Sequence, residues 1–143
     1  MNRPPLPARS GKEWSDAFAP SLDEFASLAQ AAFAALPARF RHFTGDVEFR
    51  VQDFAEPEVL DDLGIEDPFE LSGLYRGVSR LHRSPSSPHP MASMVFLYRR
   101  PILDEWADRG DVTLGELVAH VLIHEIGHHF GLSDEDIDAI QAG

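Results

Sequence analysis

Residues 124–134 read HEIGHHFGLSD, and this stretch decides how the rest of the sequence is interpreted. His124 and His128 are four positions apart, so on a helix they lie one turn apart on the same face. Their imidazoles can then bind one cation at the zinc-to-nitrogen distance of about 2.0 Å. Glu125 lies about 100° around the helix from His124, where its carboxylate can act as a general base on water without binding the metal. The stretch therefore predicts a catalytic centre of the HExxH type, with zinc as its cofactor and Glu125 as its base.

The third metal ligand is expected just after this helix. Gly131, three residues after the second histidine, can take the left-handed conformation that ends a helix and folds the chain back under the metal. Asp134 then lies ten residues after the first histidine, which completes the pattern HExxHxxGxxD. Asp134 is the favoured third ligand, and the neighbouring carboxylates Glu135 and Asp136 are alternatives.

The helix that carries the motif is expected to be mostly buried. Thr113 and Glu116 have the spacing of a capping box at its start, and Gly131 supplies its end. Apolar residues occupy the side opposite the two histidines: Val118, Leu122, Ile126 and Phe130. A buried ionised glutamate beside histidines would be costly without a cation, which favours the metal centre over a helix that contains histidines by chance.

Other histidines and one tyrosine are weaker candidates for the site. His120 could bind the metal in an HxxxHxxxH arrangement, but Glu125 would then lose its role as base. His129 points away from the metal face and is expected near the ligands or in solvent. Tyr98 could donate a hydrogen bond to an oxyanion, although a packed strand aromatic is the better interpretation.

The segment before the site predicts one amphipathic helix, three strands and a second helix. Ser21 and Glu24 form a capping box at the start of a helix that ends near Pro37. Three strands are expected afterwards, at residues 47–51, 73–79 and 94–98. A short helix is expected at residues 101–108, and residues 79–90, which include His82 and His89, read as an exposed loop.

The composition is that of one globular domain spanning residues 1–143. Hydrophobic residues make up 43% of the chain and charged residues 25%, which argues against wholesale disorder. Residues 1–20 are expected to form a flexible N-terminal extension. No uncharged run is long enough to span a bilayer, and the N-terminus lacks the apolar core of a signal peptide. The sequence therefore predicts a cytoplasmic protein that does not bind a membrane.

The chain is strongly acidic, with 24 acids, 12 bases and a formal net charge of -12. Such a field repels a phosphate backbone, so nucleic acid is not an expected partner. There is no cysteine, so any transition metal must be bound by His, Asp or Glu. Eight of the acids lie between Asp53 and Glu70. We expect this segment to be a solvated surface that pairs with arginines such as Arg99 and Arg100.

The segments MVFLYRRPI (94–102) and VLIHEIGHHFGLSDEDID (121–138) resemble the small bacterial family of minimal zincin-like metalloproteases. The resemblance covers the chain from about Phe43 to Asp138. It implies an α+β fold in which a mixed sheet of three to four strands packs on two main helices, with the HExxH helix near the C-terminus. It also implies that residues 94–98 form an edge strand, on which an extended peptide substrate pairs by strand addition.

The resulting hypothesis is a zinc-dependent metalloendopeptidase whose partner is a peptide or protein substrate. No methionine follows Asp134, so the Met-turn of the metzincins is absent. Two other classes remain open. One is a different metal-dependent hydrolase, because bacterial RNA-processing hydrolases place HxxxHxxxxxH ligands at the same offsets. The other is a zinc-binding interaction module with little turnover.

Overall fold

The computed structural model describes residues 14–44, 46–76 and 93–142. The elements follow one another in the order α2 (Leu22–Ala34), α3 (Ala38–Thr44), β1 (Val47–Gln52), α4 (Pro57–Leu63), the 3-10 helix η1 (Pro68–Glu70), β2 (Gly73–Arg76), β3 (Ser93–Tyr98), α5 (Arg99–Arg109), α6 (Leu114–His129) and α7 (Asp134–Ala142). The fold is α+β, as predicted.

A mixed three-stranded sheet forms in the described part of the chain, with β3 between β1 and β2. β1 pairs with β3 in parallel, with Val47 opposite Ser93, and β2 pairs with it antiparallel, with Gly73 opposite Leu97. The expectation that residues 94–98 form an edge strand is therefore wrong. The apolar residues on both faces of this strand are typical of a central strand, because helices cover the sheet on both sides. β2 and β1 are the edges of this sheet.

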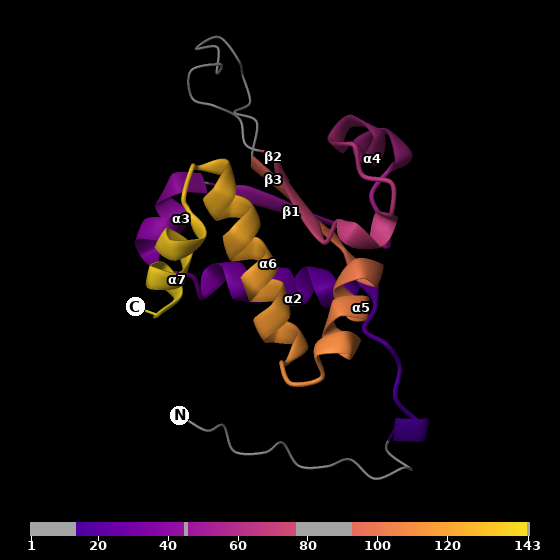
Figure 1. The fold of residues 1–143 in the computed structure, drawn as a ribbon. Coiled ribbons are helices and arrows are strands. Elements are labelled where there is room, and N and C mark those ends of the chain that lie inside the picture. The colour runs from indigo at the N-terminus through magenta and orange to yellow at the C-terminus, as the bar shows by residue number, and fades with distance from the viewer. Residues whose placement is uncertain (1–13, 45, 77–92, 143) are drawn as a thin grey trace.

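Two long helices pack together on one face of the sheet, and α6 crosses α2 in Figure 1. Ser21 caps α2 through the reciprocal hydrogen bonds predicted with Glu24. The core on this side combines buried side chains of α2, β3 and α6: Phe25, Ala29, Val95, Leu97, Val118, Leu122 and Ile126. This packing confirms the expectation of a sheet on two main helices.

The opposite face of the sheet is partly covered by α4 and the residues around η1. Tyr98 of β3 is 1% exposed and packs there with Ala55, Leu60 and Leu71. α3 and α4 have only seven residues each and were not expected from the sequence. The start of α5 lies two residues before the expected one, because Pro101 lies inside the first turn of that helix, where proline is tolerated.

The acidic segment is tied to the body through the residues that begin α5. Arg99 Nη1 lies 3.1 Å from Asp53 Oδ1, and its Nε donates a hydrogen bond to the Pro20 carbonyl oxygen at 2.6 Å. This confirms the pairing expected for Arg99. The Arg100 guanidinium instead lies over the Phe54 ring, 5.8 Å from its centroid.

Several sequence predictions lie outside the described residues. These are the first thirteen positions of the expected N-terminal extension, the end of the strand predicted at 73–79, and the whole loop predicted at 79–90 with His82 and His89. Within the described ranges, no helix is long and apolar enough to cross a membrane.

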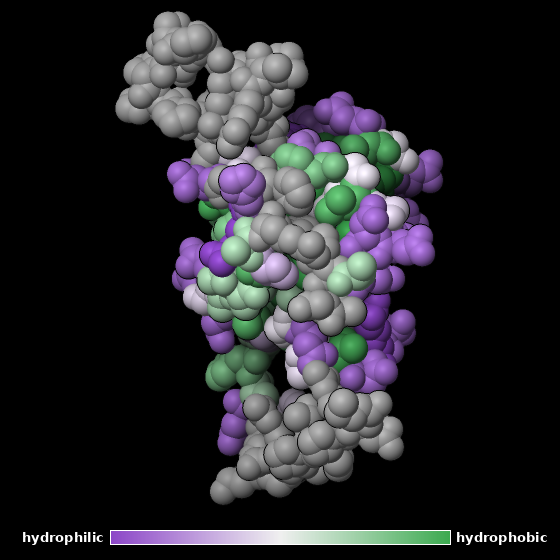
Figure 2. Space-filling view, turned by 90° about the vertical axis from the view of Figure 1, so that its left-hand side faces the viewer, coloured by the Kyte–Doolittle hydropathy of each residue, from purple (hydrophilic) through white to green (hydrophobic). Residues whose placement is uncertain are grey.

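Figure 2 shows a face on which hydrophilic side chains (purple) border hydrophobic ones (green).

Candidate metal centre

The two histidines of the motif lie near the C-terminal end of α6. This helix begins after Thr113, whose Oγ1 accepts a hydrogen bond from Glu116 N at 3.1 Å. Its apolar residues are buried against the rest of the core: Leu117, Val118, Val121, Leu122, Ile123 and Ile126. The side chain of His124 is 23% exposed and that of His128 is 53% exposed. The histidines therefore lie where the buried face of the helix meets solvent.

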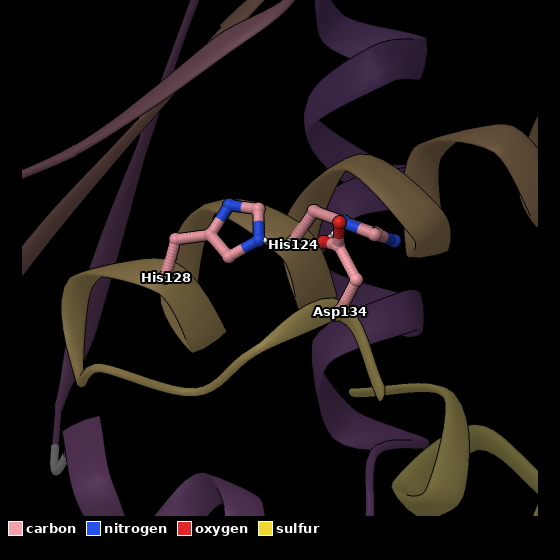
Figure 3. A group of neighbouring side chains, drawn as sticks. All are labelled: His124, His128 and Asp134. Carbon is pink, nitrogen blue, oxygen red and sulfur yellow. Dashed lines mark hydrogen bonds and ion pairs between the residues drawn. The ribbon is translucent and has the colours of Figure 1, made fainter. Parts of the chain in front are cut away.

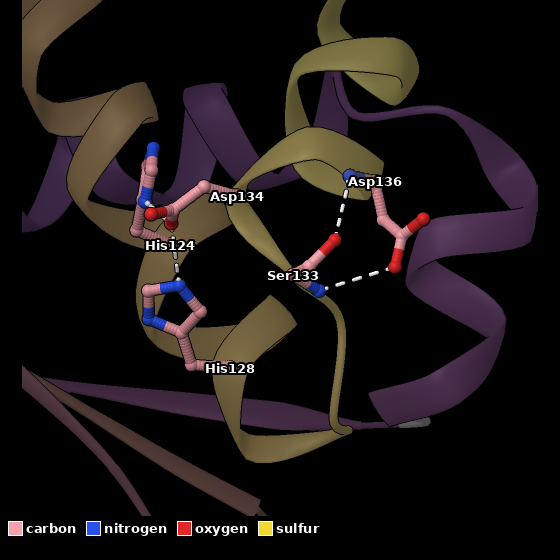
Figure 4. Close-up of polar contacts among 5 residues, drawn as sticks. All are labelled: His124, His128, Ser133, Asp134 and Asp136. Carbon is pink, nitrogen blue, oxygen red and sulfur yellow. Dashed lines mark hydrogen bonds and ion pairs between the residues drawn. The ribbon is translucent and has the colours of Figure 1, made fainter.

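A tight turn after α6 brings a carboxylate back to the histidines. Gly131 has a φ of 78°, the left-handed conformation predicted for it. α7 follows, and Ser133 caps it: Ser133 N donates to Asp136 Oδ2, and Asp136 N donates to Ser133 Oγ, both at 3.1 Å (Figure 4). This reciprocal pair fixes the direction in which α7 starts, and Asp134 is the first residue of that helix.

The side chains of His124, His128 and Asp134 converge between α6 and α7 (Figure 3). Asp134 Oδ1 lies 2.9 Å from His128 Nε2 and 3.6 Å from His124 Nδ1. The ligand atoms of a tetrahedral zinc site with bonds of about 2.0 Å are about 3.3 Å apart. The two separations that involve Asp134 lie within about 0.4 Å of this value, and all three donor atoms lie within 4.8 Å of one another. Two imidazoles with one carboxylate are a donor set that zinc accepts.

The other ring nitrogen of His124 lies away from the converging donors. His124 Nε2 is buried and has no hydrogen-bond partner among the described residues. A buried polar atom without a partner costs free energy, and which nitrogen a histidine ring presents depends on its rotation about the Cβ–Cγ bond. Only one of the two ring nitrogens can face an ion beside Asp134, so a bound cation leaves the other one unpaired. The case for a metal therefore depends on the three converging donors.

Glu125 lies on the side of α6 that faces β2. A Cβ atom at Gly73 of β2 would lie only 3.4 Å from Glu125 Cγ. Burial raises the pKa of the Glu125 carboxyl above its ordinary value, and the neighbouring His128 opposes part of this rise. A raised pKa makes the carboxylate a better proton acceptor, as a general base requires. Glu125 is not among the three converging ligands.

The two alternative carboxylate ligands lie elsewhere. Asp136 is engaged in the Ser133 cap, and Glu135 is exposed on α7. Among the described residues, the group of side chains placed to hold a metal contains Asp134 and neither of these. The geometry thus favours Asp134.

The two additional histidines of α6 also lie outside this group. The His120 ring centroid is 4.1 Å from that of His124. Burial lowers the pKa of His120, and the adjacent His124 lowers it further. The His129 ring packs edge-on against Tyr75 of β2, with 4.4 Å between centroids. These contacts give His120 and His129 packing roles beside the site.

One family of known sequences matches most of the chain. Comparison with protein families matches residues 44–143 with the zincin-like metallopeptidases, and the match includes every residue of the converging group. The protein belongs to the zincin-like metallopeptidase family. Comparison with curated proteins found no significant match.

Tyr98 of this zincin-like protein is a packed strand aromatic, as the sequence predicted. Its side chain is 1% exposed in the cluster beside α4. Burial raises the pKa of the Tyr98 hydroxyl, Arg76 opposes the rise, and Glu125 adds to it. The charge of Glu125 thus acts on the buried Tyr98 hydroxyl.

Sequence reasoning missed two glycines that shape the zincin-like site. Gly73 lets β2 approach α6 beside Glu125, and Gly127 lets α7 approach α6 beside His128. A signal for Gly127 was present, because glycine within a helix is unfavourable and needs a packing reason. No comparable signal marked Gly73, since its neighbour α6 lies far away in the sequence.

Proposed function

We propose that this zincin-like protein is a zinc-dependent endopeptidase that hydrolyses peptide bonds with Glu125 as general base. The observation that supports the proposal best is the convergence of His124, His128 and Asp134 with a half-buried glutamate on the adjacent helix position. The three converging residues would hold the zinc ion. We retain the cytoplasmic location as a prediction.

The chain's own residues divide the work as follows. Bound zinc supplies Lewis-acid chemistry, which lowers the pKa of water and polarises a carbonyl group. The Glu125 carboxylate accepts a proton from the attacking water and returns it to the leaving amine nitrogen. Its Cγ lies beside Gly73 of β2, and the side chain is half-buried there.

The substrate is proposed to pair with β2, not with β3. β3 has both edges occupied, whereas β2 is an edge strand in the described part of the chain. β2 also passes beside the site, since Gly73 lies against Glu125 and Tyr75 lies against His129. An extended peptide added to this strand would be held by main-chain hydrogen bonds next to the general base.

The first test is zinc content per chain, measured by mass spectrometry on untagged protein. Wild type should carry about one zinc, and His128→Ala and Asp134→Ala should lose it. Glu135→Ala is the matched control, because it removes the adjacent exposed carboxylate and should retain the metal. Wild type that stays free of metal after incubation with zinc would overturn the proposal.

The second test separates a peptidase from the other two function classes. Glu125→Gln should keep zinc and lower cleavage of a quenched peptide library by at least about 100-fold. A zinc-loaded wild type without any peptide cleavage would indicate an interaction module. Cleavage of RNA that does not depend on Glu125 would indicate the hydrolase class, against which the net charge of -12 argues.

A further inference from the structure

Gly127 occupies the point of closest approach between α6 and α7. A Cβ atom at this position would lie 2.8 Å from Ile137 Cδ1 and 2.9 Å from Ile137 Cγ1. Real Cβ atoms essentially never make contacts this short. Ile137 is fully buried, so its side chain has no solvent-facing space into which it could turn. A side chain at position 127 would therefore force Ile137, or the helix that carries it, to shift.

The position of Gly127 within α6 is otherwise unfavourable. Gly127 lies in the last turn of α6. Glycine is the poorest helix former after proline, so a glycine within a helix is expected to have a packing reason. Gly115, the other glycine of this helix, has open space around it, because a Cβ atom added there would meet no atom within 4 Å. The contrast indicates that Gly127 matters for the neighbouring helix and Gly115 does not.

The distance between the helices also determines where the third metal ligand lies. Gly127 immediately precedes His128, and Ile137 lies three residues after Asp134, within the first turn of α7. The pair that touches, Gly127 and Ile137, is therefore directly beside the pair His128 and Asp134, whose ligand atoms are 2.9 Å apart. A helix moved outward at Ile137 carries Asp134 outward with it.

We propose that Gly127 is a positioning residue for the metal centre: by setting the spacing between α6 and α7, it places Asp134 within reach of an ion held by the two histidines. The proposal rests on the metal site proposed above. The connecting turn supports it, because Leu132 N donates a hydrogen bond to Gly127 O at 2.9 Å and couples the start of α7 to the same residue.

The test is zinc affinity, measured by competition with a chromogenic chelator. Gly127→Ala should weaken zinc binding about 10- to 100-fold, the range found for residues that orient metal ligands. Gly115→Ala, the matched control on the same helix, should bind as wild type does. Gly127→Ala/Ile137→Ala should recover most of the affinity, because the second change removes both clashing atoms.

A second readout separates positioning from a general loss of stability. Ile137→Ala alone removes a buried side chain and lowers stability, but it leaves the helices free to keep their spacing, so its zinc affinity should stay close to that of wild type. The absorption bands of the cobalt-substituted protein should change in Gly127→Ala and not in Ile137→Ala, since they report the coordination of the metal.

The possible results are distinguishable. Wild-type affinity in folded Gly127→Ala overturns the inference, as does an equal loss of affinity in Ile137→Ala. Should Gly127→Ala not fold, Ile137→Phe tests the same spacing from the α7 side, and unchanged affinity in that variant also overturns it. A wild type that binds no zinc overturns the proposed function itself, which is a different outcome from either.

Discussion

Replacing Gly73 with alanine should impair the general base while leaving the metal in place. The added Cβ would lie 3.0 Å from Val121 Cγ1 and 3.1 Å from the Phe96 carbonyl oxygen. The shortest contact is 0.4 Å below the 3.4 Å at which ordinary contact begins. Neither neighbour has room to move, because Val121 is in the core and Phe96 O belongs to the central strand. β2 and α6 must therefore separate, at a cost of about 1 to 3 kcal/mol for an overpacked site.

Moving β2 away from α6 should displace Glu125, because its Cγ is the third atom that a Cβ at Gly73 would contact. A misplacement of about 1 Å can lower a rate about 100-fold, so a shift of a few tenths of an ångström should lower kcat about tenfold. The assay is kcat on a quenched peptide, with zinc content measured on the same samples. Val121→Ala in the same chain should restore much of kcat, and Gly115→Ala is the control. Unchanged kcat in folded Gly73→Ala, or a fall in kcat that only matches lost zinc, would refute the reasoning.

Three other predictions concern the stability of the fold. Because burial raises the pKa of Glu125, metal-free protein should lose stability relative to Glu125→Gln as the pH rises above the ordinary value of 4.5. Urea unfolding of both proteins from about pH 4 to pH 7 measures this loss, and a difference in unfolding free energy that does not change with pH contradicts the prediction. Thr113→Ala should lose the cap of α6, about 1 kcal/mol or roughly 3 °C in Tm, whereas Thr113→Ser should not, and both should retain zinc. Arg99→Gln should lower the free energy of unfolding in urea by about 2 kcal/mol, because it loses both the ion pair with Asp53 and the hydrogen bond to Pro20 O. Asp53→Asn breaks only the exposed ion pair and should lower it by less than about 1 kcal/mol. Equal losses would mean that the hydrogen bond to Pro20 contributes nothing.

The parts of the site that could be predicted from sequence are those set by local geometry. The spacing of His124 and His128, the left-handed Gly131 and the return of the chain to Asp134 all depend on residues within eleven positions of one another. The same holds for the Ser21 cap of α2 and the Thr113 cap of α6, because a cap involves only the first turn of its helix. Local rules were sufficient for these features.

The features that could not be predicted depend on which segments meet in space. The order of the strands follows from pairing between β1 and β3, whose residues are far apart in the sequence, and no local pattern specifies it. The resemblance to zincins suggested that residues 94–98 form an edge strand, whereas this strand lies between the other two. Likewise, the importance of Gly73 becomes visible only when Val121 and Glu125 are packed against it.

The closeness of the three proposed ligands along the chain has a consequence for folding. The sheet requires Val47 to find Ser93, a long-range contact whose loop-closure entropy must be overcome before the fold is stable. His124, His128 and Asp134, in contrast, lie within one short segment that an unfolded chain also contains. Zinc can therefore be chelated by the unfolded chain, and ligand binding to the unfolded state reduces the stabilisation that the native affinity alone would give. Added zinc should raise Tm by less than its affinity for the folded protein implies, and excess zinc should slow refolding by holding this segment in non-native chelates.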